Sequence, residues 1–326
     1  MICIHNKSTN PYFNLATEEY LFKTRQDNIF MLWRDEPSII VGKHQNTLSE
    51  INYEFVKNNE IKVVRRLTGG GAVFHDLGNI NFTFIQNGES GKLVDFQKYT
   101  QPILDVLLKI GIQAKFEGRN DLTIDGKKFS GNAEHVFKNR VLHHGTLLFS
   151  SVMTDLTEAL KVDENKFQDK SVKSVRSRVT NISEHLINAL TIEEFIDMVY
   201  NDVKEIYHDA IDYEFTPEDE AAINKLVEEK YSQWDWNFGY VAKYDYTKKV
   251  KTTSGLVEIN MNVHDGIITK IKFFGDYFSM KDTEELENIL INEYHREANI
   301  LKAIENVNIS EYFFNIQKEE FISLFF

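Results

Sequence analysis

The sequence predicts an α+β protein in which a large domain precedes a smaller C-terminal one. Segments with strand character, many of them joined by short turns, fill much of residues 1–150, whereas helical patterns begin to dominate at residue 191. Helices segregated in this way from runs of hairpins favour an α+β fold over a parallel, doubly wound sheet. A chain of 326 residues is longer than one typical domain. Its 42% of apolar residues can form a substantial core.

The N-terminal segments combine one helix with several strands. An Asn-Pro pair at 10–11 ends a first strand-like segment, and residues 13–25 (FNLATEEYLFKTR) are expected to form an amphipathic helix with early acidic residues. A second helix is expected over 95–111, where apolar residues recur on one face before Gly111. Between the two helices, β-branched and aromatic residues predict strands at 29–34, 38–42, 61–66 and 80–86.

Two hairpins follow this helix, and then two capped helices. An Asp-Gly pair lies between the strands of a hairpin at 121–130, and a Lys-Asn pair turns a second hairpin at 133–150. Two helix starts are then marked by capping patterns: Thr191 with Glu194, and Thr216 before Pro217.

A third hairpin predicts the C-terminal domain. Residues 255–274 alternate about an Asp265-Gly266 turn, and helical segments continue from there to the C-terminus. The polar run at 247–253 (TKKVKTT), just before this hairpin, has some linker character. We therefore expect a large domain over 1–246 and a small α+β domain over 247–326.

Charge and cysteine content exclude several classes of protein. The net charge of -13 and the pI of about 5.3 argue against a nucleic-acid-binding protein with a broad basic surface. Cys3 is the only cysteine, so neither a disulfide framework nor a thiolate metal cluster is expected. No secretory signal is visible, and no apolar run approaches the ~20 residues of a membrane helix. We expect a cytoplasmic, monomeric protein that contacts no membrane.

The histidines do not form a metal-binding pattern. Neither HxxxH nor HExxH occurs, and the neighbours His143 and His144 should face opposite ways on a strand. His75 is expected to be a hydrogen-bonding partner. No GxSxG motif is present, so a hydrolase triad lacks its nucleophile.

A glycine-rich segment at 65–79 (RRLTGGGAVFHDLGN) is the first candidate for chemistry. Three consecutive glycines suit a loop whose backbone amides face an anion, and Arg65 and Arg66 supply fork-shaped donors for a carboxylate or phosphate. The alternative is an ordinary turn with solvated arginines. We favour the anion loop. The segment matches neither a P-loop nor a dinucleotide fingerprint.

Two further segments carry candidate residues. In residues 118–135 (GRNDLTIDGKKFSGNAEH), Asp121 begins a hairpin that returns with Lys127 and Lys128. A lysine near an anion loop can neutralise developing charge, although the spacing alone favours a solvated hairpin edge. Residues 170–181 (KSVKSVRSRVTN) are basic in an acidic chain, and fit a solvated loop or a flap over a phosphate equally well.

Together these three segments resemble the lipoate–protein ligase family. They match its motifs in order and spacing, as do the downstream HHGTLL, FNLATEEY near the start and WDWNFG near the end. The resemblance covers essentially the whole chain. It implies a large, mixed, mainly antiparallel sheet with flanking helices, the biotin/lipoyl ligase-like and class II synthetase-like fold, plus a small α+β C-terminal domain.

The resemblance implies a two-step reaction with ATP, Mg²⁺ and lipoate. The lipoate carboxylate attacks the α-phosphate of ATP, and the resulting lipoyl-AMP gives its acyl group to the ε-amine of one lysine on an acceptor protein. The expected acceptors are acyltransferase subunits of 2-oxoacid dehydrogenases and the glycine cleavage H protein. The sequence does not show which acceptor is preferred or whether lipoate is preferred to octanoate. It also does not identify a general base for the transfer step.

Site residues are carried over from the family's motifs. Lys128 would be the catalytic residue, in contact with both the carboxyl group and the α-phosphate. Asp121 would hold magnesium, and Arg176 and Arg178 would belong to a flap over the adenylate. The nucleotide would be held by Arg66, Gly71, Ala72, Val73, Phe74 and Asn79. The lipoyl chain would be wrapped by the loop residues Arg65, Thr68, Gly69, Gly70 and Gly71.

One position departs from the family, and two other functions compete. Leu67 stands where small polar residues are common, so we expect it to affect how the loop packs on the acyl chain. An ATP-independent acyltransferase of the same fold would need a cysteine nucleophile, and only Cys3 is available. A non-catalytic binder of lipoyl domains would have no use for both anion-handling segments.

Overall fold

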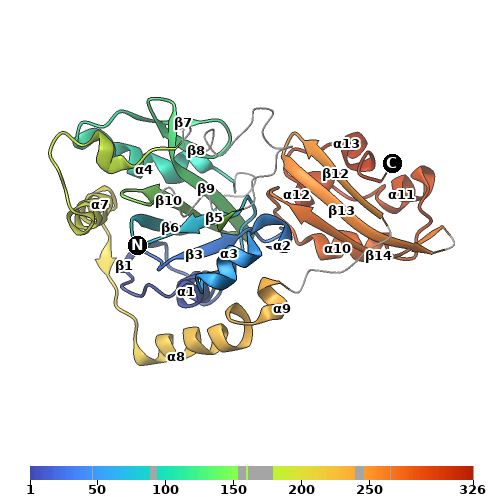
Figure 1. Cartoon of the computed structure of the whole chain (residues 1–326), viewed down its shortest axis with the longest axis horizontal. Coiled ribbons are helices and arrows are strands. Elements are labelled where there is room, and N and C mark those ends of the chain that lie inside the picture. The colour runs from blue at the N-terminus through green and yellow to red at the C-terminus, as the bar shows by residue number, and fades with distance from the viewer. Residues whose placement is uncertain are drawn as a thin grey trace.

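A computed structural model of the chain describes residues 1–45, 47–88, 94–152, 159–160, 179–238, 246–264 and 266–325. The N-terminal part is built on an eight-stranded sheet, and the C-terminal part on a separate three-stranded sheet with its own helices (Figure 1). This arrangement confirms the predicted α+β class and the large, mixed sheet.

The eight-stranded sheet is parallel only at one end. Strand β1 pairs in parallel with both of its neighbours, and all other pairs are antiparallel. The Asp-Gly turn between β8 and β9 has positive φ at Asp125 and Gly126, the geometry that such a turn requires. In sheet order the strands are β11 (Ile211–Asp212), β1 (Ile2–His5), β2 (Ile29–Trp33), β6 (Asn79–Asn87), β10 (Arg140–Leu148), β9 (Lys127–Phe137), β8 (Asp121–Ile124) and β7 (Ala114–Glu117).

Helices cover both faces of this sheet. Helices α4 (Phe96–Lys109) and α7 (Ile192–Ile206) pack on one face, where Phe82 and Phe84 lie in the largest apolar cluster. Helices α1 (Pro11–Thr24) and α8 (Pro217–Leu226) pack on the other. The predicted caps at Thr191 and Thr216 are both present as reciprocal capping boxes. Shorter helical segments are α2 (Thr47–Glu50), α3 (Tyr53–Asn58), α9 (Trp234–Asn237), η1 (Ile182–His185) and η2 (Val227–Tyr231).

A second, small sheet carries the glycine-rich loop. Its central strand β3 (Ser38–Val41) pairs in parallel with β4 (Lys62–Arg65) and antiparallel with β5 (Val73–His75). The loop therefore begins where β4 ends and returns to the sheet as β5. Ile40 and Val64 of this sheet join the apolar cluster of α1, which fixes the loop against the main sheet.

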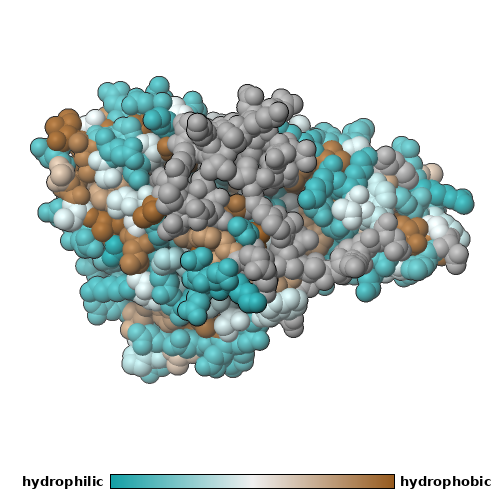
Figure 2. Space-filling model, viewed as in Figure 1, coloured by the Kyte–Doolittle hydropathy of each residue, from teal (hydrophilic) through white to brown (hydrophobic). Residues whose placement is uncertain are grey.

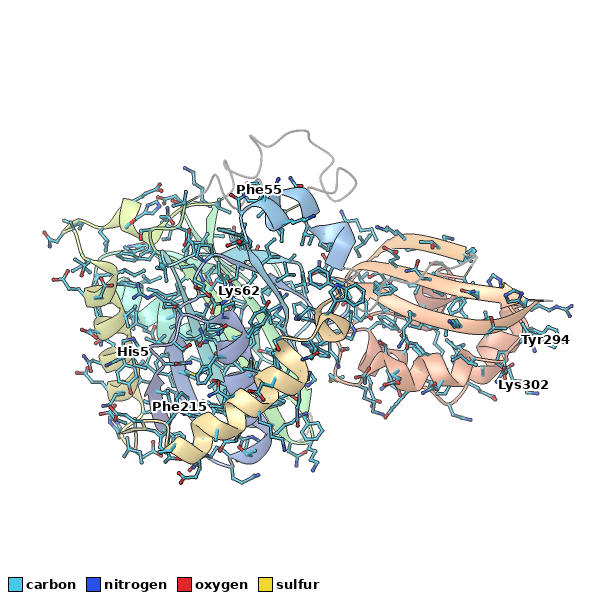
Figure 3. The ribbon with its side chains drawn as sticks, turned by 60° about the horizontal axis from the view of Figure 1, so that its bottom comes forward. His5, Phe55, Lys62, Phe215, Tyr294 and Lys302 are labelled. Atoms are coloured by element: carbon cyan, nitrogen blue, oxygen red, sulfur yellow. The ribbon has the colours of Figure 1, made fainter. Side chains whose placement is uncertain are left out.

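The C-terminal domain has an independent core. Strands β12 (Tyr246–Thr252), β13 (Gly255–His264) and β14 (Ile267–Gly275) form an antiparallel sheet. Figure 3 shows Tyr294 and Lys302 at the end of this domain farthest from the large sheet. The predicted hairpin at 255–274 is confirmed, with Asp265 of its turn outside the described residues. The helices of this domain are α10 (Thr283–Leu290), α11 (Glu297–Ala303), α12 (Ile309–Tyr312) and α13 (Lys318–Ile322).

The polar run at 247–253 is largely a strand, contrary to its linker-like composition. Its side chains alternate between exposed and half-buried along β12, an outer strand of the three-stranded sheet. Exposed lysines on such a strand discourage pairing with other chains, which explains a polar sequence without a linker. We retain the division into 1–246 and 247–326 as a proposal.

Helix α1 is buried on more than one side, so the amphipathic pattern predicted for it is wrong. It lies between the large sheet, the small sheet and α8, and its acidic residues Glu18 and Glu19 are both buried in its third turn, with none in the first. Glu19 accepts hydrogen bonds from Lys23 Nζ (2.6 Å), Lys230 Nζ (2.7 Å) and Tyr231 Oη (2.7 Å). A carboxylate with such partners can be buried. The helical periodicity of apolar residues would instead have placed these glutamates on the solvent-exposed side.

The outer surface agrees with the charged composition. Among the described residues on the face seen in Figure 2, most are hydrophilic and apolar ones lie between them. Among the described residues, no helix is long and apolar enough to cross a membrane.

Replacing Glu19 by glutamine is expected to lower the free energy of unfolding at pH 7 by about 2 kcal/mol, because a buried carboxylate loses its ammonium partners. Burial acts to raise the pKa of Glu19, but Lys230, Lys23 and Tyr231 together hold it below its ordinary value of 4.5. The ionised form therefore stabilises the fold above that value, and this stability is lost as the pH falls through the lower folded value. Urea unfolding at pH 7 and pH 3 should show the difference from wild type shrinking in acid. An equal difference at both values would contradict the assignment.

Candidate active site

A cavity of about 160 Å³ lies where the glycine-rich loop meets the large sheet. Helix α1 and strands β2 and β3 supply apolar side chains at one part of its wall, and the loop and strand β9 supply the cations Arg66 and Lys128. The lining residues are Leu15, Trp33, Ile40, Arg66, Gly70, Gly71, Ala72, Val73, His75, Asn81, Asn120, Lys128, Gly131, Asn132, Ala133, His144, Gly145 and Thr146.

Arg66 shapes the loop and is a buried cation in the cavity wall. Its guanidinium donates to the carbonyl oxygens of Ile40 (3.0 Å), Gly69 (2.7 Å) and Gly71 (2.8 Å), and to Thr68 Oγ1 (2.9 Å). Burial lowers its pKa to about 10, which leaves the group cationic at neutral pH. Among the described residues, no carboxylate forms an ion pair with it. A bound anion would supply the missing countercharge.

Arg65 points away from the cavity, contrary to the expectation that it contacts the acyl chain. Its side chain is completely buried, so the solvated-turn alternative is also excluded. The guanidinium donates to the carbonyl oxygens of residues 42, 43 and 45 and to those of Trp236 and Asn237. Successive residues on an extended chain face opposite ways, which is why this arginine holds the fold together while its neighbour lines the cavity.

The three glycines have three different surroundings. A Cβ on Gly69 would overlap the carbonyl oxygen of Tyr277 in the C-terminal domain. Gly70 has φ +94°, in the region that favours glycine. A Cβ on Gly71 would meet no heavy atom within 4 Å, because this residue faces the open cavity. Leu67, the departure from the family, does not line the cavity.

Residues 72–79 divide between the cavity and its support. Ala72 and Val73 line the cavity, whereas the Phe74 side chain packs into the apolar cluster behind β3. Asn79 is fully buried next to the cavity and donates to Asn81 Oδ1 (2.9 Å). His75 Nδ1 bonds Asp35 Oδ2 (2.8 Å), which confirms its predicted role as a hydrogen-bonding partner.

The hairpin β8–β9 brings Lys128 and Asp121 together. Lys128 Nζ lies 2.7 Å from Asp121 Oδ1, and both side chains are about 40% exposed. Lys128 lines the cavity, whereas Lys127 is exposed to solvent, so the solvated-edge interpretation holds only for Lys127. Arg176 and Arg178 lie outside the described residues. The chain just after them is tied to the site, since the Thr180 amide donates to the Lys128 carbonyl (3.0 Å).

His143 and His144 face opposite sides of the sheet, as expected. His143 bonds Glu134 (2.9 Å), and His144 bonds Glu18 (2.9 Å). Burial raises the pKa of Glu134 to about 8 and lowers that of His143, so burial favours the uncharged form of both groups. Among the described residues, no cluster of three or more potential ligands could hold a metal ion.

Several residues that line the cavity were not predicted from the sequence motifs. Leu15, Trp33 and His144 line the cavity from three separate elements, and Glu18 lies behind His144. The available signal was the pair of glutamates in FNLATEEY, because two acidic residues amid the apolar positions of a helix are unusual unless they have buried partners.

Two family models match the chain. The lipoyl protein ligase A/B catalytic domain matches residues 10–204, and the bacterial lipoate protein ligase C-terminus matches residues 242–325. The chain belongs to the lipoate–protein ligase family. Lipoate–protein ligase LplJ of Bacillus subtilis is 40% identical over 335 residues, and the match covers the whole of both chains. The family resemblance that the motifs predicted is thus confirmed.

Two solved structures of this family are similar to the chain. LipL1 of P. falciparum in complex with lipoate has a TM-score of 0.80 at 27% identity, covering 99% of this chain and 97% of that one. A lipoate–protein ligase A bound with ATP has a TM-score of 0.64 at 26% identity, covering 73% and 98%. The fold expected from the resemblance is therefore confirmed.

Gly71→Ala is expected to leave the thermal midpoint within about 2 °C of wild type but to weaken lipoate binding at least tenfold. The added methyl group meets no protein atom and projects into the cavity. Differential scanning fluorimetry and calorimetric titration with lipoate, the ligand of the similar P. falciparum protein, measure the two effects. Gly69→Ala is the matched comparison, because its methyl group strikes the Tyr277 carbonyl and should lower the midpoint. Wild-type affinity in Gly71→Ala would contradict this placement of the loop.

Proposed function

We propose that the chain activates free lipoate with ATP and transfers the lipoyl group to a lysine of an acceptor protein. The observation that carries the proposal is the cavity itself, whose wall combines apolar side chains with the two cations Arg66 and Lys128. Such a cavity suits a ligand with a long apolar chain and an anionic end. The family membership and the similar lipoate- and ATP-bound structures support the same assignment.

The apolar wall would hold the acyl chain. Leu15, Trp33 and Ile40 provide contact area for the methylene groups and the dithiolane ring, whose burial is favourable. Of the loop residues, Gly70 and Gly71 line the cavity and would contact the chain, whereas Thr68 and Gly69 do not line it and would support the loop. Water excluded by this wall cannot hydrolyse an activated acyl group.

The cationic part would bring two anions together. In the first step a lipoate oxygen attacks the α-phosphorus of ATP, the bond to the β-phosphate oxygen breaks, and pyrophosphate leaves. Lys128 would contact the carboxylate and the α-phosphate, and Arg66 would offset the charge of both. The backbone from Gly71 to Phe74 and the Asn79 side chain would hold the nucleotide.

Asp121 fits a magnesium ion that arrives with ATP. Mg²⁺ is commonly bound by one or two carboxylates together with substrate phosphates, and this residue supplies one carboxylate beside the cavity. The ion would screen the phosphate charge. Lys128 would then exchange its bond to Asp121 for one to the substrate anions, so the pair keeps the lysine near its working position.

In the second step the acceptor amine attacks the acyl carbon. The bond from that carbon to the phosphate oxygen breaks, AMP leaves, and the amine gives up a proton as the amide forms. We propose that the acceptors are acyltransferase subunits of 2-oxoacid dehydrogenases and the glycine cleavage H protein. We propose that the chain acts in the cytoplasm as a monomer.

Lys128→Ala is expected to reduce lipoate-dependent exchange between ATP and pyrophosphate by about 10²–10³-fold, the usual effect of removing one preorganised donor at the reacting centre. Lys127→Ala is the control, because this neighbouring lysine is exposed and does not line the cavity. Undiminished exchange in Lys128→Ala, or no exchange by wild type, would refute the proposal.

Cys3→Ser is expected to leave acyl transfer within about twofold of wild type. Cys3 is completely buried in strand β1 and does not line the cavity. Burial raises the pKa of its thiol to about 11, so little thiolate exists at neutral pH. The ATP-independent transferase, which needs a cysteine nucleophile, is therefore disfavoured. Mass spectrometry of an apo-acceptor, with and without ATP, distinguishes the two reactions, and transfer abolished in Cys3→Ser would restore the alternative.

A further inference from the structure

Glu18 is a buried carboxylate to which the reaction assigns no role. It is 2% exposed in α1 and accepts hydrogen bonds from Thr83 Oγ1 (2.6 Å) and from His144 Nδ1 (2.9 Å to Oε1, 3.0 Å to Oε2). Among the described residues, no lysine or arginine forms an ion pair with it. A buried carboxylate held only by hydrogen bonds is costly, which indicates that its bonds serve a purpose.

One chain of hydrogen bonds connects Glu18 to the cationic wall of the cavity. His144 Nε2 lies 2.8 Å from Thr68 Oγ1, and Arg66 Nε donates to the same oxygen (2.9 Å). Arg66 in turn holds the carbonyl oxygens of Gly69 and Gly71. Every link from Glu18 to Gly69 is buried, and the link to Gly71 is partly buried. The position of the glycine-rich loop is therefore coupled to a carboxylate of helix α1.

For a neutral imidazole, the direction of every bond in this chain follows from the groups at its two ends. A guanidinium only donates and a carboxylate only accepts. Arg66 therefore donates to Thr68, and His144 donates from Nδ1 to Glu18. The unprotonated Nε2 then accepts from the Thr68 hydroxyl, so the neutral ring carries its proton on Nδ1. Hydrogen bonds aligned in one direction polarise and strengthen one another.

A second chain connects Glu18 to the apolar wall. Trp33 Nε1 donates to Thr83 Oγ1 (2.9 Å), and the Thr83 hydroxyl donates to Glu18 Oε1. An indole N–H is a donor only, so this chain also runs toward the carboxylate. Both chains end at the same group, and each begins at a residue that lines the cavity.

We propose that Glu18 is a positioning residue for the ligase reaction: it fixes the His144 tautomer and thereby orients Arg66 and the glycine-rich loop, and through Thr83 it orients Trp33. This inference rests on the proposed function, because its kinetic effect is on lipoate activation. One carboxylate sets the relative placement of the anion-binding and acyl-binding walls.

Glu18→Gln tests the first chain with little change in volume. Both carboxylate oxygens lie within 3.0 Å of His144 Nδ1. Because the Thr83 hydroxyl donates to Oε1, the amide oxygen of glutamine is expected at that position and its N–H₂ group at the position of Oε2, where it donates toward Nδ1. The imidazole proton is expected to move to Nε2. His144 then donates toward Thr68, and the chain from Arg66 is reversed at that link.

The chain offers a matched control in Glu19→Gln. Glu19 is equally buried on the same helix, but its partners are Lys23, Lys230 and Tyr231, which do not line the cavity. If Glu18 has only a structural role, both substitutions should lower stability and leave the kinetics alone.

Three measurements on the full chain decide the question. ¹⁵N NMR of the ring nitrogens, assigned with His144→Asn, should show Nδ1–H in wild type and Glu19→Gln but Nε2–H in Glu18→Gln. Pyrophosphate exchange should show KM for lipoate raised about tenfold in Glu18→Gln only, the effect of losing one hydrogen bond to a charged group. Urea unfolding gives the stability of both variants. An unchanged tautomer, or equal kinetics in the two variants, would overturn the proposal.

Two further variants separate the chains and guard against misfolding. Thr68→Val breaks the chain to Arg66 but leaves Glu18 in place, so KM should rise by a similar factor while the proton stays on Nδ1. Thr83→Val breaks only the chain to Trp33 and should change the ratio of kcat/KM for lipoate over octanoate at least threefold. An unchanged KM in Thr68→Val, or an unchanged ratio in Thr83→Val, would remove that chain from the proposal.

The tautomer result does not depend on activity. If wild type shows no pyrophosphate exchange, the proposed function fails, whereas the ¹⁵N spectra and calorimetric titration with lipoate still test whether Glu18 organises the cavity. If wild type is active and the spectra of Glu18→Gln match wild type, the positioning role alone fails.

Discussion

The shape of the site depends on one buried guanidinium, that of Arg65. Burying an ionised group is tolerable only when its donors are paired, and here the partners are carbonyl oxygens from residues 42, 43 and 45 and from Trp236 and Asn237. Two segments nearly 200 residues apart must therefore converge on the end of strand β4. That convergence fixes the point at which the glycine-rich loop begins.

The two adjacent arginines have different roles because successive side chains on an extended chain point to opposite sides. Arg65 faces the interior, and Arg66 faces the loop that follows, where its donors hold Gly69 and Gly71. The carbonyl oxygens of the loop that accept from Arg66 are thereby paired within the protein. The charge of Arg66 lies in the cavity wall without an ion-pair partner among the described residues, which suits the substrate anions of the proposed reaction.

Local patterns were enough to predict much of the fold. β-Branched runs, the Asp125-Gly126 turn and the two capping boxes each act over a few residues, so the sequence specifies them directly. The glycine-rich loop was recognisable from its residue types and spacing, whereas Lys128 was singled out only by the family resemblance, because its spacing alone favoured a solvated hairpin edge. The sequence did not show which of the two arginines would face the interior. Neighbouring residues on an extended chain point to opposite sides, but the pattern does not indicate which side is buried.

Buried polar residues that pair with one another were not predictable from the local sequence. Periodicity assigns Glu18 and Glu19 to solvent, and only their partners from β6, β10 and η2 reverse that assignment. The polar run at 247–253 misled for the opposite reason, because an outer strand can be as hydrophilic as a linker. The first error comes from contacts distant in sequence, and the second comes from an outer strand whose exposed side carries polar residues although its backbone pairs with the next strand of a hairpin.

The contact of Gly69 with Tyr277 also limits how this protein can be recombined. The backbone of the loop lies directly against a carbonyl group of the C-terminal domain, with no side chain between them to absorb a misfit. A chimaera that joins this N-terminal part to a relative's C-terminal domain must place the backbone carbonyl group equivalent to that of Tyr277 in nearly the same position. Separate family models match the two parts, but at this contact the backbone of one part fits directly against the backbone of the other.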